Sequence, residues 1–150
     1  MRSVRAMGFL ARKQHETAEL LRDQIDPLVG ADEELRGCVY ATRPGRMSVR
    51  LYSIGVTDRR LILREVDRKW RPTPDPPISL THDEVTVGNI FSEGARWTLG
   101  DKDLEIRFSG GGEDYRLTVL GGTLIENALA GAEQLTGLDA LIEFLRAAGA

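Results

Sequence analysis

The stretch YSIGVTDRRLIL, residues 52–63, contains the strongest structural signal in the chain. Apolar and β-branched residues stand on both sides of a short polar segment, Thr57-Asp58-Arg59. Asp58 favours a tight turn because its carboxylate can hydrogen-bond the backbone nearby. Two such runs joined by so short a turn predict an antiparallel hairpin. We therefore expect strands over residues 49–57 and 60–68.

The segments around this hairpin also predict strands. Alternation is clearest where Leu104, Ile106 and Phe108 alternate with charged residues, and a glycine turn at 110–112 joins this run to the next. The four prolines of residues 71–77 remove four backbone donors and predict an extended loop. The remaining strands are expected at residues 38–42, 78–80, 85–91, 96–99 and 115–119.

Helical periodicity appears at both ends of the chain. Asp26-Pro27 is expected to end the first helix, which begins near residue 9. Near the C-terminus, Thr123 with Glu126 and Thr136 with Asp139 have the spacing of capping boxes. They predict either two helical segments or one helix broken near Gly131 or Gly137. The second segment has an apolar stripe formed by Leu138, Leu141, Ile142 and Leu145.

Composition limits the class of protein. A chain of 150 residues with 41% hydrophobic and 29% charged residues fits one globular domain. The lone Cys38 excludes an internal disulfide framework. The basic N-terminus is not followed by the apolar stretch of a signal peptide. Both features favour the cytoplasm. A net charge of −3 argues against a general nucleic-acid binder. No apolar run approaches the roughly 20 residues of a membrane-spanning helix.

The chain resembles a known superfold. About seven short antiparallel strands before a closing helix is the element order of pleckstrin-homology (PH) domains. Residues 52–63 resemble the strand–turn–strand hallmark of bacterial PH-like and GRAM-like domains. The acidic turn at 30–35, and Ile78-Ser79-Leu80 followed by Asp83-Glu84-Val85, resemble the flanking elements of those families. The resemblance covers roughly residues 30–148.

This resemblance implies an α+β fold, a seven-stranded antiparallel PH-like barrel or sandwich with a C-terminal capping helix. Residues 30–150 would form the PH-like domain, and residues 1–29 an additional N-terminal amphipathic helix. The four residues of the C-terminal stripe would then close the barrel. Domains of this kind are non-enzymatic scaffolds that bind anionic lipid head groups, peptides or protein surfaces, and several bacterial members form homo-oligomers.

Candidate catalytic groups are scarce. His82-Asp83-Glu84 is the only place where a histidine and carboxylates cluster, and consecutive side chains point in different directions. Residues 110–112 lead into a strand, unlike phosphate-binding loops, which lead into a helix. Gly121-Gly122-Thr123 does precede a helix and is explained by a plain N-cap. We therefore expect no catalytic residues, no metal site and no cofactor.

Residues Pro74 to Pro77 have a PxxP spacing. This spacing is compatible with recognition of a polyproline segment by a partner or with a stiff connecting loop.

Two features indicate binding. Basic residues gather on the first two predicted hairpins, where they could contact an anion or lipid or simply form a solvated charged face: Arg43, Arg46, Arg50, Arg59 and Arg60. The N-terminal helix has a surplus apolar face that could pack on its own domain, on a second copy or at a membrane: Phe9, Leu10, Leu20, Leu21 and Ile25. The favoured hypothesis is a non-catalytic interaction module that self-associates or binds a protein partner. Peripheral binding to anionic membranes through the arginines is the alternative.

Overall fold

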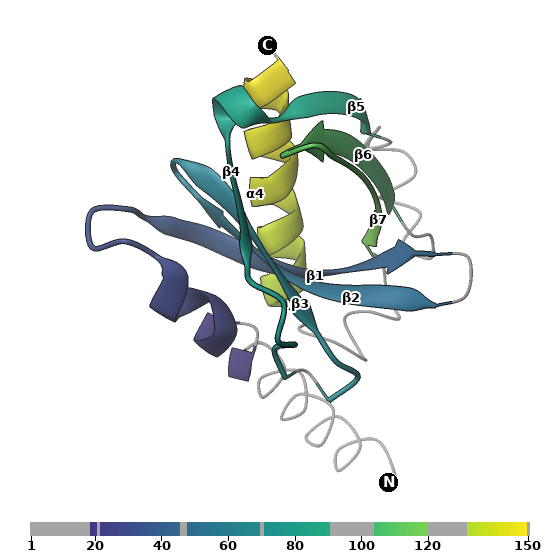
Figure 1. The fold of residues 1–150 in the computed structure, drawn as a ribbon. Coiled ribbons are helices and arrows are strands. Elements are labelled where there is room, and N and C mark those ends of the chain that lie inside the picture. The colour runs from purple at the N-terminus through teal and green to yellow at the C-terminus, as the bar shows by residue number, and fades with distance from the viewer. Residues whose placement is uncertain are drawn as a thin grey trace, which may run out of the picture.

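The computed structural model describes residues 19–20, 22–45, 48–69, 71–90, 104–119 and 132–149. Seven antiparallel strands form one sheet that bends around a C-terminal helix, an α+β fold (Figure 1). The strands are β1 (Leu35–Pro44), β2 (Val49–Thr57), β3 (Arg60–Val66), β4 (Ile78–Thr81), β5 (Thr86–Ile90), β6 (Leu104–Gly110) and β7 (Glu113–Val119). The helices are the short 3-10 turns η1 (Asp26–Leu28) and η2 (His82–Glu84), and α4 (Ala132–Gly149). The expected strand at 96–99 lies outside the described residues.

The strand order is β4-β3-β2-β1-β7-β6-β5. β4 and β5 are consecutive in the chain, with only η2 and Val85 between them, yet they occupy opposite edges of the sheet. The sheet must therefore curl until its edges approach each other near η2. The expected α+β fold of seven antiparallel strands with a C-terminal helix is confirmed. Within the described ranges the two edges do not pair, so of the expected barrel or sandwich the sheet does not form a closed barrel. The short η2 connection turns the chain away before β4 and β5 can form a ladder.

The two hairpin turns follow from local side-chain chemistry. In the β2–β3 turn, Thr57 Oγ1 accepts hydrogen bonds from the backbone N–H groups of Arg59 and Arg60, at 3.1 and 3.0 Å. Asp58 instead accepts the N–H of Glu34 at 2.8 Å, so Thr57, and not the predicted Asp58, caps the turn. In the β6–β7 turn, Gly111 and Gly112 have φ values of 60° and 83°, which suit glycine. Both predicted hairpins are confirmed.

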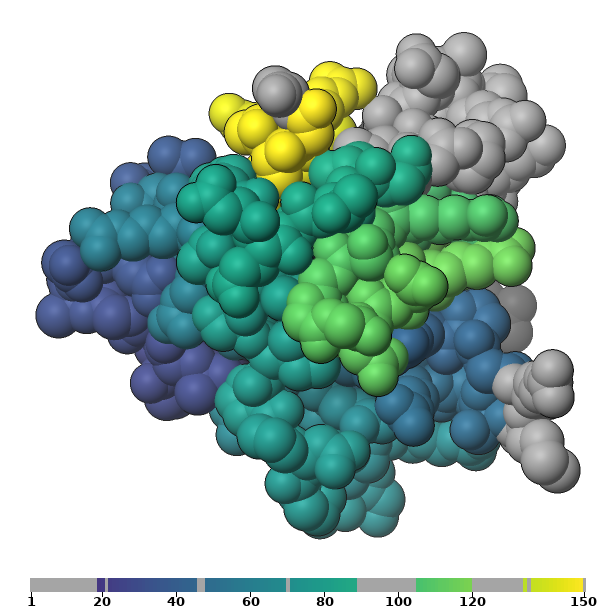
Figure 2. Space-filling view, turned by 45° about the horizontal axis from the view of Figure 1, so that its top comes forward, coloured from purple at the N-terminus to yellow at the C-terminus, as the bar shows by residue number. Residues whose placement is uncertain are grey.

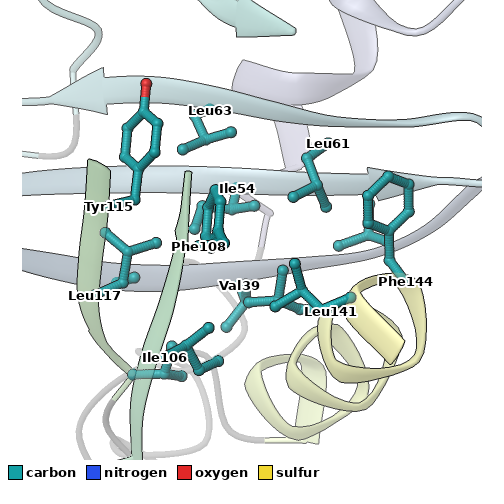
Figure 3. Close-up of a cluster of buried hydrophobic side chains, with 14 of the residues drawn as sticks. Val39, Ile54, Leu61, Leu63, Ile106, Phe108, Tyr115, Leu117, Leu141 and Phe144 are labelled. Carbon is teal, nitrogen blue, oxygen red and sulfur yellow. The ribbon is translucent and has the colours of Figure 1, made fainter. Parts of the chain in front are cut away.

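The main core lies between α4 and the inner face of the sheet. Figure 3 shows Leu141 and Phe144 of α4 at one end of this core and Tyr115 of β7 at the other. Leu138, Leu141 and Leu145 are fully buried, and Ile142 packs against the same cluster while partly exposed. In Figure 2 only the C-terminal part of α4 is visible, in yellow above the teal β4–β5 region. The apolar stripe of this helix therefore covers the sheet.

α4 approaches β1 unusually closely. A Cβ atom on Gly137 would lie 2.0 Å from the carbonyl oxygen of Cys38. One turn earlier, the buried Gln134 side chain accepts the Tyr40 N–H and donates to the Tyr40 carbonyl, both at 2.8 Å. The helix runs through Thr136 and Gly137 without a break, so the predicted cap and break there are wrong. Gly137 is needed for close contact and does not end the helix. The first predicted capping box, at residues 123–126, lies outside the described residues.

A second, smaller apolar cluster covers the outer face of β1–β3. Ile25 ends the helical residues 22–25, just before η1, as Asp26-Pro27 predicts. Its side chain is fully buried and fills the notch over Gly55, where a Cβ atom would lie 2.3 Å from Ile25 Cγ2. Cys38, Tyr40 and Ile62 complete the cluster. Because both faces are covered, residues 37–41 of β1 are all buried.

Candidate binding cleft

An open cleft of about 240 Å³ lies where the inner face of the sheet continues beyond the core. Successive inward residues change there from apolar to charged. β1 proceeds from Val39 through Ala41 to Arg43, and β2 proceeds in reverse from Ile54 through Tyr52 to Arg50. The polar residues that line the cleft are Arg43, Arg50, Tyr52, Glu65, Asp75, Glu113 and Tyr115.

Arg43 and Arg50 are direct cross-strand partners in the β1–β2 ladder. Like charges in this position destabilise a hairpin unless other groups compensate. Arg43 Nη2 donates to Glu113 Oε2 at 3.1 Å and to the Asp114 carbonyl at 2.8 Å. Its guanidinium also lies 4.8 Å from the centroid of the Tyr115 ring, a cation–π contact. The second arginine is exposed at the mouth of the cleft.

The Tyr52 hydroxyl joins the two arginines. The hydrogen bond from Arg50 to this oxygen is the main cause of the raised pKa of Arg50. Burial lowers the pKa of Arg43, but its hydrogen bonds to Tyr52 and Glu113 outweigh that effect and raise it. Both guanidinium groups are therefore cationic at any physiological pH, and both lie beside the hydroxyl group of the buried Tyr52.

A carboxyl pair, Glu65 and Asp75, also lines the cleft, and Glu65 is the cross-strand partner of Tyr52 in the β2–β3 ladder. Burial raises the pKa of Glu65, and a hydrogen bond with Asp75 raises it further, although Arg50 opposes the shift. The Thr73 N–H donates to the Glu65 carbonyl at 3.0 Å, and Pro72 pairs with Val66 in an isolated bridge. The predicted 71–77 loop is therefore confirmed as a connection and lies along β3 beside the cleft.

Of the four predicted arginines that the structure describes, the cleft brings together two, Arg43 and Arg50. Arg60 is at the other end of the β2–β3 hairpin, where its Nη2 lies 2.6 Å from Glu33 Oε1 and 2.6 Å from the Leu28 carbonyl. Arg59 pairs with Asp32 at 3.1 Å. Arg60 therefore serves as a structural link between the N-terminal segment and β3. Arg46 lies outside the described residues.

The predicted apolar face of the first helix divides in a similar way. Ile25 belongs to the chain's own outer cluster, so it is removed from the predicted partner interface. Leu20 is 43% exposed. The other three residues of that face, Phe9, Leu10 and Leu21, lie outside the described residues.

Sequence reasoning did not identify Tyr52, Glu65 and Tyr115 as site residues. The alternation of inward and outward residues could have found them, since each precedes or follows a core position by two residues.

The side chains of the His82-Asp83-Glu84 cluster have structural contacts. His82 stacks on Phe144 with ring centroids 3.9 Å apart, and Glu84 completes a capping box with Thr81. Among the described residues no three His, Cys, Asp or Glu side chains are grouped so that they could hold a metal ion. No helix in the described ranges is long and apolar enough to span a membrane.

Comparison with known proteins gives few matches. No protein-family model matches the chain, and no curated protein matches it. Among solved structures, the chain is similar to the DH/PH domains of a p115-RhoGEF mutant, with 12% sequence identity and a TM-score of 0.45. That match covers 99% of this chain and 43% of the other, so this chain spans less than half of that structure's length.

Proposed function

We propose that this chain is a non-catalytic binding module whose cleft accepts an extended, carboxylate-bearing segment of a protein partner. The cross-strand pair of Arg43 and Arg50 at the open cleft is the observation on which the proposal rests. Two like charges held opposite each other need compensating groups, and the main ionic one here is the exposed Glu113 carboxylate. A carboxylate on a ligand would supply further negative charge to this pair.

The present partner of Arg43 suggests the chemistry of the ligand. The Glu113 side chain is 59% exposed, and an exposed ion pair contributes only about 0–1 kcal/mol. A partner carboxylate could therefore replace Glu113 with little loss, and it would gain Arg50 and the Tyr52 hydroxyl as further donors. The Tyr115 and Tyr52 rings supply the aromatic contacts that are enriched at protein interfaces.

The same cleft supports the membrane alternative less well. Lipid head groups require several basic side chains acting together. Here Glu65, Asp75 and Glu113 line the cleft beside its two arginines. Arg59 and Arg60, at the far end of the sheet, are paired with acidic residues. A mixed-charge cleft suits a peptide segment better than a polyanionic surface.

Selection from a displayed random peptide library tests this proposal. Peptides that bind the native chain should be enriched in Asp and Glu and should lose roughly tenfold or more in affinity against Arg50→Gln. Arg68→Gln, a change of an exposed arginine outside the cleft, is the matched control and should bind like the native chain. Enrichment without acidic residues, or equal binding to Arg50→Gln, would contradict the proposal.

A second proposal concerns self-association. Leu20 is a large apolar side chain, 43% exposed, on a helical segment whose end packs on the sheet through Ile25. We propose a second copy of the chain as the partner of this face. Light scattering should then show a dimer or larger species that Leu20→Ser weakens. A native chain that stays monomeric at tens of micromolar would rule this proposal out without affecting the first.

A further inference from the structure

The outer face of β5–β7 contains a cavity of about 360 Å³ that is separate from the cleft. Its lining combines two small residues, Gly88 and Ser109, with two long ones, Arg107 and Arg116. Arg107 and Arg116 alternate along their strands with the inward-facing Phe108 and Tyr115, which are buried. The ladder between β5 and β6 shifts register between Val87 and Asn89, which places Gly88 in a bulge. The small residues and the bulge produce the hollow.

The two arginines of this cavity are held as a pair. Arg107 and Arg116 are direct cross-strand partners in the β6–β7 ladder. Glu105 Oε1 accepts hydrogen bonds from Arg107 Nε and Nη2, at 3.2 and 3.1 Å, and from Arg116 Nε. The bond from Arg116 is the largest cause of the lowered pKa of Glu105, so this carboxylate stays ionised. One acid thus positions two guanidinium groups and leaves a net positive charge.

Further donors at this pair are available to a ligand. Within the described part of the chain, no hydrogen bond involves Arg107 Nη1 or either Nη atom of Arg116. These N–H groups outnumber what the two oxygens of a carboxylate can accept, whereas a phosphate monoester offers three terminal oxygens and a phosphodiester offers two terminal and two ester oxygens. The Thr86 and Ser109 residues contribute hydroxyl groups to the same lining. The donor set therefore suits a phosphoryl group.

A negative charge lies at the other end of the cavity. Asp114 pairs with Ser109 in the ladder, two residues along each strand from the arginine pair, a separation of about 7 Å. Asp114 lines the cavity and disfavours a ligand that is anionic throughout. A cationic N–H donor on the ligand would instead satisfy this carboxylate.

We propose that this cavity binds a phosphoryl group linked to a primary ammonium group, the chemistry of a phosphoethanolamine moiety. Arg107 and Arg116 bind the phosphoryl oxygens, and Asp114 accepts from the ammonium group. The moiety can belong to a free ester or to a lipid head group. The cleft of the proposed function has no part in this site.

Calorimetric titration of the full chain with phosphoethanolamine and with inorganic phosphate tests the site. Phosphoethanolamine should bind more tightly than phosphate, and Arg116→Gln should weaken its binding roughly tenfold or more. Asp114→Asn should remove the preference for the amine while phosphate still binds. Arg50→Gln, in the other cleft, is the control and should bind like the native chain. Equal affinity for both compounds, or no effect of Arg116→Gln, would overturn the proposal.

A vesicle assay distinguishes the two sources of the moiety. Phosphatidylcholine vesicles with and without phosphatidylethanolamine are sedimented with the native chain and with Arg116→Gln. Binding that requires phosphatidylethanolamine and is lost in the variant supports the site with a lipid head group as the source. Binding of the soluble ester alone supports the site with a free ester as the source. Binding of neither would overturn the proposal.

Discussion

Glu33 is the carboxylate on which several separate segments of the fold converge. It accepts hydrogen bonds from Arg60 and the Thr57 hydroxyl, and also from the Gly30 N–H at 2.8 Å. The hydrogen bond from Arg60 is the main cause that lowers its pKa from 4.5 to about 2, against the effect of burial. The N-terminal segment is thus bound to the β2–β3 hairpin through one side chain.

The lowered pKa of Glu33 predicts a pH-dependent contribution to stability. The ionised form is favoured in the folded state, so the contribution is complete above pH 4.5 and is lost as pH falls towards about 2. Glu33→Gln should lower the free energy of unfolding at neutral pH by on the order of 2 kcal/mol, with the difference shrinking in acid. Urea denaturation of the native chain and of Glu33→Gln, at neutral pH and in acid, measures this difference in the free energy of unfolding. Asp32→Asn, whose native side chain is exposed, is the control, and an equal loss at both pH values would contradict the assignment.

The pH dependence of stability expected from Glu65 is opposite to that expected from Glu33. Its pKa is raised by burial and by Asp75, so its contribution to stability is complete below the unfolded pKa and is lost as pH rises through the folded pKa. Glu65→Gln should therefore stabilise the chain at neutral pH relative to acid pH. Denaturation curves for the variant and the native chain across this range measure the change. A stability difference that does not vary with pH would show that the carboxyl pair is absent in solution.

At the scale of elements, the contact between β1 and α4 depends on glycine at two facing positions. A Cβ atom on Gly37 would lie 2.8 Å from the Gly137 Cα atom, so neither residue can gain a side chain without separating the elements. The two hydrogen bonds of Gln134 to Tyr40 require the same close approach. Strand β1 meets β7 at Thr42, and α4 covers the stretch before it.

We therefore expect Gly137→Ala, which adds a single methyl group, to cause a large loss of stability. Alanine normally favours a helix by about 1 kcal/mol over glycine, but overpacking here should outweigh that and lower the free energy of unfolding by about 2 kcal/mol or more. Gly149→Ala is the matched control in the same helix, because its Cβ atom would lie an ordinary 3.5 Å from Val87. It should be neutral or stabilising. Thermal denaturation of both variants gives the comparison, and similar midpoints would contradict the close packing.

At the scale of the whole molecule, β1–β3 form the middle of three layers. α4 covers their inner face, and the segment from Gln24 to Val29 covers their outer face. Arg64 and Arg60 of β3 donate to the carbonyls of Gln24 and Leu28, so the outer layer is held by polar as well as apolar contacts. Cys38 lies beneath this layer and is 2% exposed, which makes its thiol a reporter of how firmly the layer is attached.

Ile25→Ala should loosen the outer layer. Removing this fully buried side chain leaves a cavity over Gly55 and should lower the free energy of unfolding by about 2–5 kcal/mol. The reaction of Cys38 with a thiol reagent should accelerate accordingly. Val49→Ala, at a side chain that is 58% exposed, is the control and should leave the labelling rate unchanged. Unchanged labelling in Ile25→Ala would mean that the layer does not protect the thiol.

Several elements of this fold could be predicted from short-range pattern. The β2–β3 hairpin, the glycine turn at 111–112, the end of the first helical segment at Ile25 and the apolar stripe of α4 all depend on residues close together in the chain. Periodicity and turn chemistry act over that distance. For the same reason the sequence indicates Arg43 and Arg50 as candidates, since one hairpin contains both.

Contacts between distant segments could not be predicted in this way. Nothing near Gly137 in sequence indicates that the carbonyl of Cys38 lies where its Cβ atom would be, and nothing near Arg60 indicates that Glu33 neutralises it. The open edges of the sheet and the position of Tyr115 beside Arg43 likewise depend on how the sheet curls. Local pattern thus specified the described strands, the two hairpin turns and the apolar stripe of α4. Long-range packing determined which charges are neutralised and which remain available to a ligand, because neutralisation depends on distances in space that no spacing along the chain encodes.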